Sequence, residues 1–466
     1  MKKLSFVLFV LLLTLNVGGQ TQTSPKLCAA CIRKNLEFLA SDTMRGRGSG
    51  TEDEHKAARF IGRILKTYGI QPAGDQGGFV QRIATTRTMI TGKPKLHVTG
   101  HGTTHTFIYG EDFLSVYLSR TQLSGTLKKI NLDKDELKGE PGRIFLLTGS
   151  DPAKVRAAAF SAFASGEFAA LIPAKNTSEK YFEDRGRTLP KIPPKLEGQK
   201  TSEMGGNFNV LEFSPKAMEI LSSLPDGANV QFDTPSTVSR GFTWNAVGFL
   251  RGTDPTLRHA AVLFSAHLDH IGIGRPVKGD NIYNGADDDA SGTVAVLELA
   301  RVLGSGKRPK RTVVFALFGS EEVGGLGSTY FREHPPLPLK AIAANLEFEM
   351  IGRADSAVAA DSLWLTGWER SNLGPTLAEH GARLVPDPHP DEQFFSRSDN
   401  YVLAKKGVVA QTISSYGLHG DYHQPSDDIA HIDFKHMNEA IGSLLKPIQW
   451  LVNSDFKPQW REGGQP

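Results

Sequence analysis

The chain has 466 residues, of which 39% are hydrophobic and 22% are charged, and its formal net charge is +3. This composition is that of an ordinary globular protein, and the length allows more than one domain. This near-neutral net charge does not indicate the clustered basic face that nucleic-acid binding needs, so no nucleic-acid partner is expected.

The first residues predict export. Lys2 and Lys3 precede an apolar run over residues 6–13, and small and polar residues follow at 18–20. This order is typical of a cleaved signal peptide, which we expect over residues 1–20. The run is shorter than the roughly 20 residues of a transmembrane helix, and no later run is long enough, so no membrane span is expected in the mature chain. We therefore expect a periplasmic or extracellular protein.

The only two cysteines, Cys28 and Cys31, are spaced C-x-x-C. Two cysteines cannot complete a four-cysteine metal site, and a thioredoxin-like redox site would need the motif at the end of a strand in a βαβ unit. Here the motif precedes a helical pattern. In an oxidising compartment a local disulfide is the expected state.

The rest of the chain divides into three parts. Residues 27–90 predict the N-terminal helical part of the main domain, with an amphipathic helix over 54–68 and a glycine-rich loop at 45–50. An anion-binding role for that loop would need a preceding strand, which the pattern lacks. Over residues 91–236, short β-rich runs alternate with turns rich in Gly, Pro and Lys, which predicts an inserted small β-rich domain.

Residues 237–456 repeat a pattern of strand, loop and helix. Continuous apolar strands that alternate with helices indicate a mostly parallel sheet covered on both faces. The predicted fold class is therefore α/β: a mostly parallel or mixed sheet flanked by helices, with the small β-rich domain inserted before it.

Five short segments of the second half carry carboxylates or imidazoles, which are ligands for divalent metals. They are S-A-H-L-D-H (265–270), G-A-D-D-D-A-S-G (285–292), G-S-E-E-V (319–323), E-F-E-M-I-G (347–352) and D-Y-H (421–423). The first, third and fourth of these segments fall at the ends of predicted strands. Because ligands gather at the carboxyl ends of the strands in such sheets, we expect the charged side chains to meet at one metal site.

With these segments in this order, the chain resembles the zinc aminopeptidases of the M28 metallopeptidase family from about residue 36 to 451, with a protease-associated-like domain inserted. The resemblance implies a secreted metallo-aminopeptidase that acts on peptides with two zinc ions. The implied metal ligands are His267, Asp288 as the bridging carboxylate, Glu322, Glu349 and His423. The implied catalytic residues are Glu321 as general base, Asp269 as the acid that orients His267, and Tyr422 near the oxyanion.

One position departs from the family pattern. The fourth ligand is normally an aspartate in a D-M-I-G or D-M-V-G motif, and the matching residue here is Glu349. Glu347, two residues earlier on the same strand face, is an alternative ligand. Phe394 and Phe395 resemble positions near the substrate pocket and are equally consistent with plain core residues.

Three other functions stay open on the sequence. A glutaminyl cyclase on the same fold binds a single zinc and does not need the full ligand set. A carboxypeptidase or dipeptidase on the same fold is a second alternative, which a panel of free and blocked dipeptides would distinguish. A non-catalytic, receptor-like homologue would lack ligands or the base, and neither is missing here. Oligomeric state cannot be read from the sequence.

Overall fold

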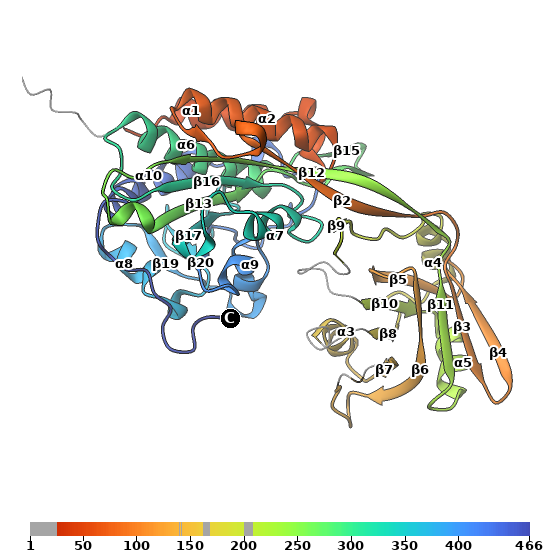
Figure 1. The fold of residues 1–466 in the computed structure, drawn as a ribbon. Coiled ribbons are helices and arrows are strands. Elements are labelled where there is room, and N and C mark those ends of the chain that lie inside the picture. The colour runs from red at the N-terminus through yellow and green to blue at the C-terminus, as the bar shows by residue number, and fades with distance from the viewer. Residues whose placement is uncertain (1–25, 139, 141, 162–167, 200–207) are drawn as a thin grey trace, which may run out of the picture.

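The computed structural model describes residues 26–138, 140, 142–161, 168–199 and 208–466, so the predicted signal peptide lies outside it. In this part of the chain two large sheets form, of ten and eight strands. Figure 1 shows them side by side, connected by the long strands β2 (Val80–Ile90) and β12 (Ser236–Leu250). These two strands pair antiparallel from Val80 opposite Ala246 to Ile90 opposite Ser236, so a two-stranded ribbon leads from one sheet to the other.

The ten-stranded sheet has a parallel centre. Its order is β19 (Leu384–Pro386), β18 (Leu363–Leu365), β20 (Val409–Ser414), β17 (Ile342–Phe348), β13 (Ala261–His267), β16 (Val313–Phe318), β12, β2 and β9 (Lys195–Leu196), with β1 (Gln71–Pro72) paired to β12. The strands β20, β17, β13 and β16 run parallel, whereas β12 and β18 run antiparallel to their neighbours in this group. The predicted mixed sheet is confirmed, and the four parallel strands end at one edge.

Helices cover both faces of this sheet. On one face pack α1 (Ala29–Leu39), α2 (Glu52–Thr67), α6 (Gly292–Ser305) and α10 (Phe434–Leu451), and on the other α7 (Leu326–Glu333) and α9 (Asn400–Ala404), with α8 (Leu373–Glu379) beside α10. Along β13, Phe264 joins the first core and Leu263 the second, because successive side chains point to opposite faces. Within the described ranges no helix is long and apolar enough to cross a bilayer.

The eight-stranded sheet is built from residues between Lys95 and Asp233. Its order is β4 (Thr103–Ile108), β3 (Lys95–Gly100), β11 (Asn229–Asp233), β6 (Gln122–Asn131), β7 (Arg143–Thr148), β8 (Phe168–Pro173), β10 (Phe208–Phe213) and β5 (Phe113–Leu118), with helices α3 (Pro152–Ser161), α4 (Glu179–Gly186) and α5 (Pro215–Ser223). Phe113, Leu171 and Phe213 are buried in a core of its own. A two-stranded sheet, β14 (Gly272–Val277) with β15 (Asp280–Tyr283), lies apart from both.

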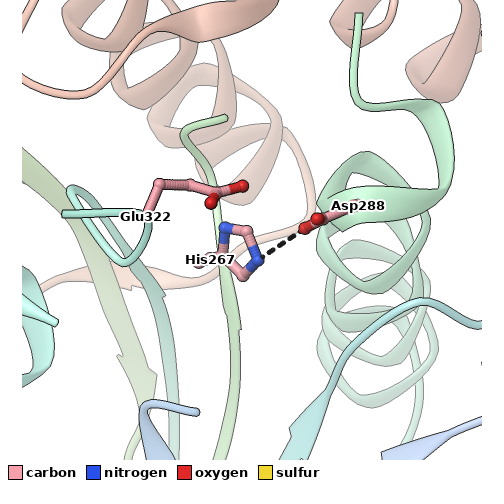
Figure 2. Close-up of side chains that lie close together, drawn as sticks. All are labelled: His267, Asp288 and Glu322. Atoms are coloured by element: carbon pink, nitrogen blue, oxygen red, sulfur yellow. Dashed lines mark ion pairs between the residues drawn. The ribbon is translucent and has the colours of Figure 1, made fainter. Parts of the chain in front are cut away.

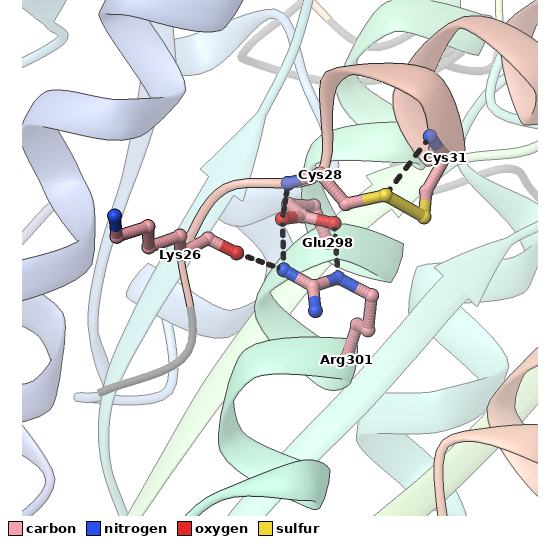
Figure 3. The surroundings of a disulfide bond; sticks show 5 residues. All are labelled: Lys26, Cys28, Cys31, Glu298 and Arg301. Carbon is pink, nitrogen blue, oxygen red and sulfur yellow. Dashed lines mark hydrogen bonds and ion pairs between the residues drawn. A yellow bond between two sulfur atoms is a disulfide. The ribbon is translucent and has the colours of Figure 1, made fainter. Parts of the chain in front are cut away.

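The expected disulfide forms between Cys28 and Cys31, at the start of α1. Figure 3 shows it against α6, where the Cys28 amide donates to Glu298 Oε1 at 2.7 Å. Arg301 holds the same carboxylate and also donates to the Lys26 carbonyl. The first turn of α1 is therefore fastened to α6, the helix that follows the aspartate-rich loop.

Candidate metal centre

Three strand ends bring the charged segments to one edge of the ten-stranded sheet. His267 is the last residue of β13, Glu349 directly follows β17, and Glu321 comes three residues after β16. Because β13 lies between β16 and β17 and runs parallel to both, these three side chains start from neighbouring positions. This is the edge where ligands bind in parallel sheets.

Asp288 stands between two imidazoles at this edge. Its Oδ1 lies 3.1 Å from His267 Nε2, and its Oδ2 lies 3.2 Å from His423 Nε2. Glu322 Oε2 is 3.0 Å from the same nitrogen of His423. His267, Asp288 and Glu322 each offer a ligand atom, and these atoms lie within 4.8 Å of one another (Figure 2). A carboxylate that faces a different imidazole with each oxygen has the arrangement of a bridging ligand.

A pocket opens onto this group. Its lining includes Asp288, Glu321, Glu322, Glu349, Tyr422 and His423. The ring of Tyr422 stacks on that of His423, with 3.9 Å between the centroids. The structure therefore brings together the residues that the sequence offered as ligands and base.

Glu347 and Glu349, the two alternatives for the fourth ligand, lie in different surroundings. Glu347 is fully buried, and its Oε2 accepts from the Asn400 amide at 2.6 Å and from Thr412 Oγ1 at 3.1 Å. Glu349 lines the pocket, and Glu347 does not. Of the two glutamates, Glu349 is therefore the one that faces the pocket.

Asp269 lies behind the pocket. The His267 Nδ1 is 3.2 Å from the main-chain carbonyl of Asp269 and 3.7 Å from its carboxylate, so the carbonyl is the closer acceptor. The carboxylate accepts from Ser49 Oγ at 2.6 Å and from the Glu321 amide at 3.0 Å. Asp269 thus orients His267 through its main chain and holds the Glu321 loop through its side chain.

The aspartates that flank Asp288 brace the surrounding main chain. Asp289 accepts from the amides of Gly292, the first residue of α6, and His267, at 3.0 and 3.1 Å. Asp287 accepts from the Gly352 amide at 2.7 Å. Both side chains are fully buried, so they orient the loop and leave Asp288 to face the pocket.

His270 is a member of the site to which sequence reasoning assigned no role. It is fully buried, and its Nδ1 lies 2.7 Å from Glu322 Oε1. Glu322 is therefore held between two imidazoles, His270 behind it and His423 in front. His270 closes the S-A-H-L-D-H segment, but the segment does not tell which way this second histidine faces.

The surroundings give the carboxyl groups different proton affinities. Burial opposes ionisation of Asp288, but His270, His267 and His423 hold its pKa well below the usual range. Burial raises the pKa of Glu321 well above its usual value, and nearby acids including Glu349 raise it further. Asp288 thus stays an anion suited to metal binding, whereas Glu321 holds a proton more readily.

The donor set fits zinc. His267 Nε2 is buried without a hydrogen-bond partner, although it faces the Asp288 carboxylate. Zinc takes imidazole nitrogen and carboxylate oxygen, and its histidine ligands usually donate from the other ring nitrogen to a carbonyl or carboxylate. The contact between His267 Nδ1 and the Asp269 carbonyl meets that second condition.

The aromatic residues of the pocket show which of the two adjacent phenylalanines, Phe394 and Phe395, faces it. Phe394 lines the pocket and stacks on Trp364, with 5.4 Å between the ring centroids, and Tyr416 lies beside it at 5.9 Å. Phe395 instead packs into the core between the sheet and α9. Of the two adjacent phenylalanines, only Phe394 faces the pocket.

Together with the fold, this donor set places the chain among the zinc-dependent metallopeptidases. Residues 245–446 match the model of Peptidase family M28, and this part of the chain belongs to that family. Leucine aminopeptidase 1 of Fusarium vanettenii is 27% identical over 310 residues, which cover 63% of this chain and 78% of that protein. Aminopeptidase YwaD of Bacillus subtilis is 27% identical over 215 residues, and the match covers 44% of each protein.

Two solved structures share the fold over most of the chain. An aminopeptidase from Aneurinibacillus sp. strain AM-1 has a TM-score of 0.58 at 17% identity, and the match covers 92% of this chain and 95% of that one. BSAP, a zinc aminopeptidase from Bacillus subtilis, has a TM-score of 0.51 at 20% identity, with 93% and 97% covered. Both matches extend across the two large sheets.

Proposed function

We propose that the protein is an exported aminopeptidase that removes N-terminal residues from peptides at a centre of two zinc ions. The observation that carries the proposal is Asp288, whose two oxygens face His267 and His423 from one position between them. His267, Asp288, Glu322, Glu349 and His423 would hold the ions, with Asp288 shared. Zinc, when bound, polarises the scissile carbonyl and lowers the pKa of its water to about 7.

Glu321 is the proposed general base. It lines the pocket beside Asp288 and Glu322, and its amide is fixed by Asp269. A general base works best when its pKa lies near the operating pH, and burial raises the pKa of Glu321 in that direction. Glu321 would accept the proton of the attacking water and pass it to the leaving amine.

Tyr422 is the proposed donor to the oxyanion. Burial and the neighbouring carboxylates of Asp288 and Glu322 raise its pKa above the usual tyrosine value. The phenol therefore keeps its proton at neutral pH and can donate a hydrogen bond to developing negative charge.

The relatives favour cleavage at the amino end, since Leucine aminopeptidase 1 and YwaD are aminopeptidases by name. The pocket lining carries the carboxylates of Asp288, Glu321, Glu322 and Glu349, which would balance the charge of two zinc ions. Trp364, Phe394 and Tyr416 form an aromatic wall that suits an apolar side chain. The disulfide between Cys28 and Cys31 supports export, because such bonds persist in oxidising compartments.

The test is a comparison of leucine anilide with its N-acetylated form, before and after chelation. We expect cleavage of the free amine only, loss of activity when a chelator removes the metal, and recovery when zinc is added back. Equal cleavage of the blocked anilide would exclude the aminopeptidase assignment. Cyclisation of an N-terminal glutamine peptide without hydrolysis would favour the cyclase instead.

A further inference from the structure

Arg47 is buried directly behind the metal centre, with 1% of its surface exposed. Its Nε donates to the Leu268 carbonyl at 2.9 Å, and its Nη1 donates to the carbonyls of Leu39 and Asn284, both at 2.7 Å. Its Nη2 donates to the Gly285 carbonyl at 2.8 Å. We call Arg47 and these four main-chain carbonyls the arginine clamp.

The clamp joins the main chain beside His267 to the main chain of the turn that contains Asp288. Leu268 directly follows His267, and Gly285 precedes the turn Ala286–Ser291 that contains Asp288. One guanidinium therefore fixes the main chain on both sides of the 3.1 Å contact between His267 and Asp288. The planar fork of arginine can hold several acceptors in fixed directions, which the single ammonium of lysine cannot.

The segment around Arg47 also supports the proposed base. Ser49 donates to the Asp269 carboxylate, which accepts in turn from the Glu321 amide. Glu54, fully buried on α2, accepts from Ser320 Oγ at 3.1 Å, one residue before Glu321. The glycine-rich loop thus contacts two of the loops at the edge of the sheet directly, and it supports the loop of Glu321 through Asp269.

The backbone at Arg47 is unusual. Arg45, Gly46 and Arg47 have φ values of 47°, 67° and 48°, in the left-handed region that non-glycine residues rarely adopt. At Gly46 a side chain would also collide, since an added Cβ would lie 2.1 Å from the Tyr283 carbonyl. Backbone of this kind persists only where its surroundings hold it, and it concentrates at functional sites.

We propose that Arg47 is a positioning residue whose clamp sets the separation of His267 and Asp288 and thereby the zinc affinity of the centre. The inference rests on the proposed function, since it requires that these two side chains bind zinc. It also gives the glycine-rich loop a role other than anion binding: the charge of Arg47 is directed inward onto main-chain carbonyls.

The chain offers a matched control in Arg311. This arginine is also buried, with 2% exposed, and donates to the carbonyls of Ala260 at 3.0 Å, Ser454 at 3.1 Å and Phe456. Ala260 precedes β13 and Leu268 follows it, so Arg311 and Arg47 hold opposite ends of the same strand. A loss of main-chain hydrogen bonds at Arg311 should lower the free energy of unfolding and leave the zinc affinity of the metal centre unchanged.

The experiment compares Arg47→Lys and Arg311→Lys with the wild type. Zinc affinity is measured by competition with a chelator, and the melting temperature is measured without metal and at increasing zinc concentration. We expect both variants to melt lower without metal. Only Arg47→Lys should bind zinc more weakly, by about 10–100-fold, as removal of an outer partner of a metal ligand typically causes.

The outcomes separate the two proposals. Zinc affinity in Arg47→Lys equal to that of Arg311→Lys would overturn the positioning role, whereas a wild type that binds no zinc would overturn the proposed function first. If Arg47→Lys does not fold without metal, its zinc-dependent melting shift still reports affinity. If it does not fold at all, Arg47→Gln replaces it, since glutamine keeps two donors on a shorter side chain, and unchanged affinity in that variant overturns the inference.

Discussion

Replacement of Glu321 by glutamine should lower the turnover of leucine anilide by about 10²–10⁴-fold, the contribution typical of a general acid–base group. The side chain keeps its size, so the pocket stays intact, but the amide cannot accept the proton of the attacking water. The ligands His267 and Asp288 are untouched, and zinc content should therefore match that of the wild type. Turnover is measured by steady-state kinetics and zinc by elemental analysis of the same samples.

Glu212 provides the control for this substitution. It lies on β10 in the eight-stranded sheet, is 3% exposed, and accepts from Tyr181 and Arg156. Glu212→Gln makes the same chemical change at a buried residue outside the pocket, and should leave turnover unchanged. Turnover near the wild-type value in Glu321→Gln would show that another group is the base.

Replacement of Asp288 by asparagine should remove both zinc ions and nearly all activity. The carboxylate faces His267 with one oxygen and His423 with the other, and its pKa is held well below the usual range, so it is the one proposed ligand that both ions share. The loss should exceed the roughly 10–100-fold that removal of an outer partner costs.

A graded comparison tests the sharing directly. His423→Ala removes a donor from one ion only, so it should keep one zinc per chain where Asp288→Asn keeps none. The measurement is zinc per chain after dialysis against metal-free buffer. If Asp288→Asn retained as much zinc as His423→Ala, Asp288 would not be the bridging ligand.

The convergence of the charged side chains at one sheet edge could be predicted because its signals are local. Apolar strands that alternate with helices imply a parallel sheet, and His267, Glu321 and Glu349 each stand at or just after the end of such a strand. Parallel strands end at a common edge, so the convergence of these residues followed from topology without any knowledge of contacts.

The contacts behind that edge could not be predicted in the same way. Arg47 meets Leu268 and Gly285 across more than 200 residues, and nothing in the glycine-rich loop marks its arginine as buried. His270 shows the same limit, since a second histidine in a short motif has no periodicity that tells whether it faces the ligand or solvent. Short strand pairings such as that of β9 with β2 could not be predicted either, because two residues are too few to show a strand pattern.

The division into domains follows partly from the sequence. The change in texture near residues 91 and 236 falls where β2 and β12 leave the ten-stranded sheet, at Ile90 and Ser236. We propose that residues 91–236 are the protease-associated-like insert and that residues 27–90 and 237–456 together form the peptidase domain. The full length of β2 and β12 could not be predicted. Near Ile90 and Ser236, buried and exposed side chains alternate only weakly along these strands, and many stay partly exposed.

The most direct test of the account is the zinc content of the purified wild-type chain at saturation, measured by elemental analysis alongside protein concentration. Convergence of His267, Asp288, Glu322, Glu349 and His423 predicts two zinc ions per chain. One ion per chain would contradict the shared-carboxylate centre and favour the cyclase-type site, and none would contradict the metallopeptidase assignment itself.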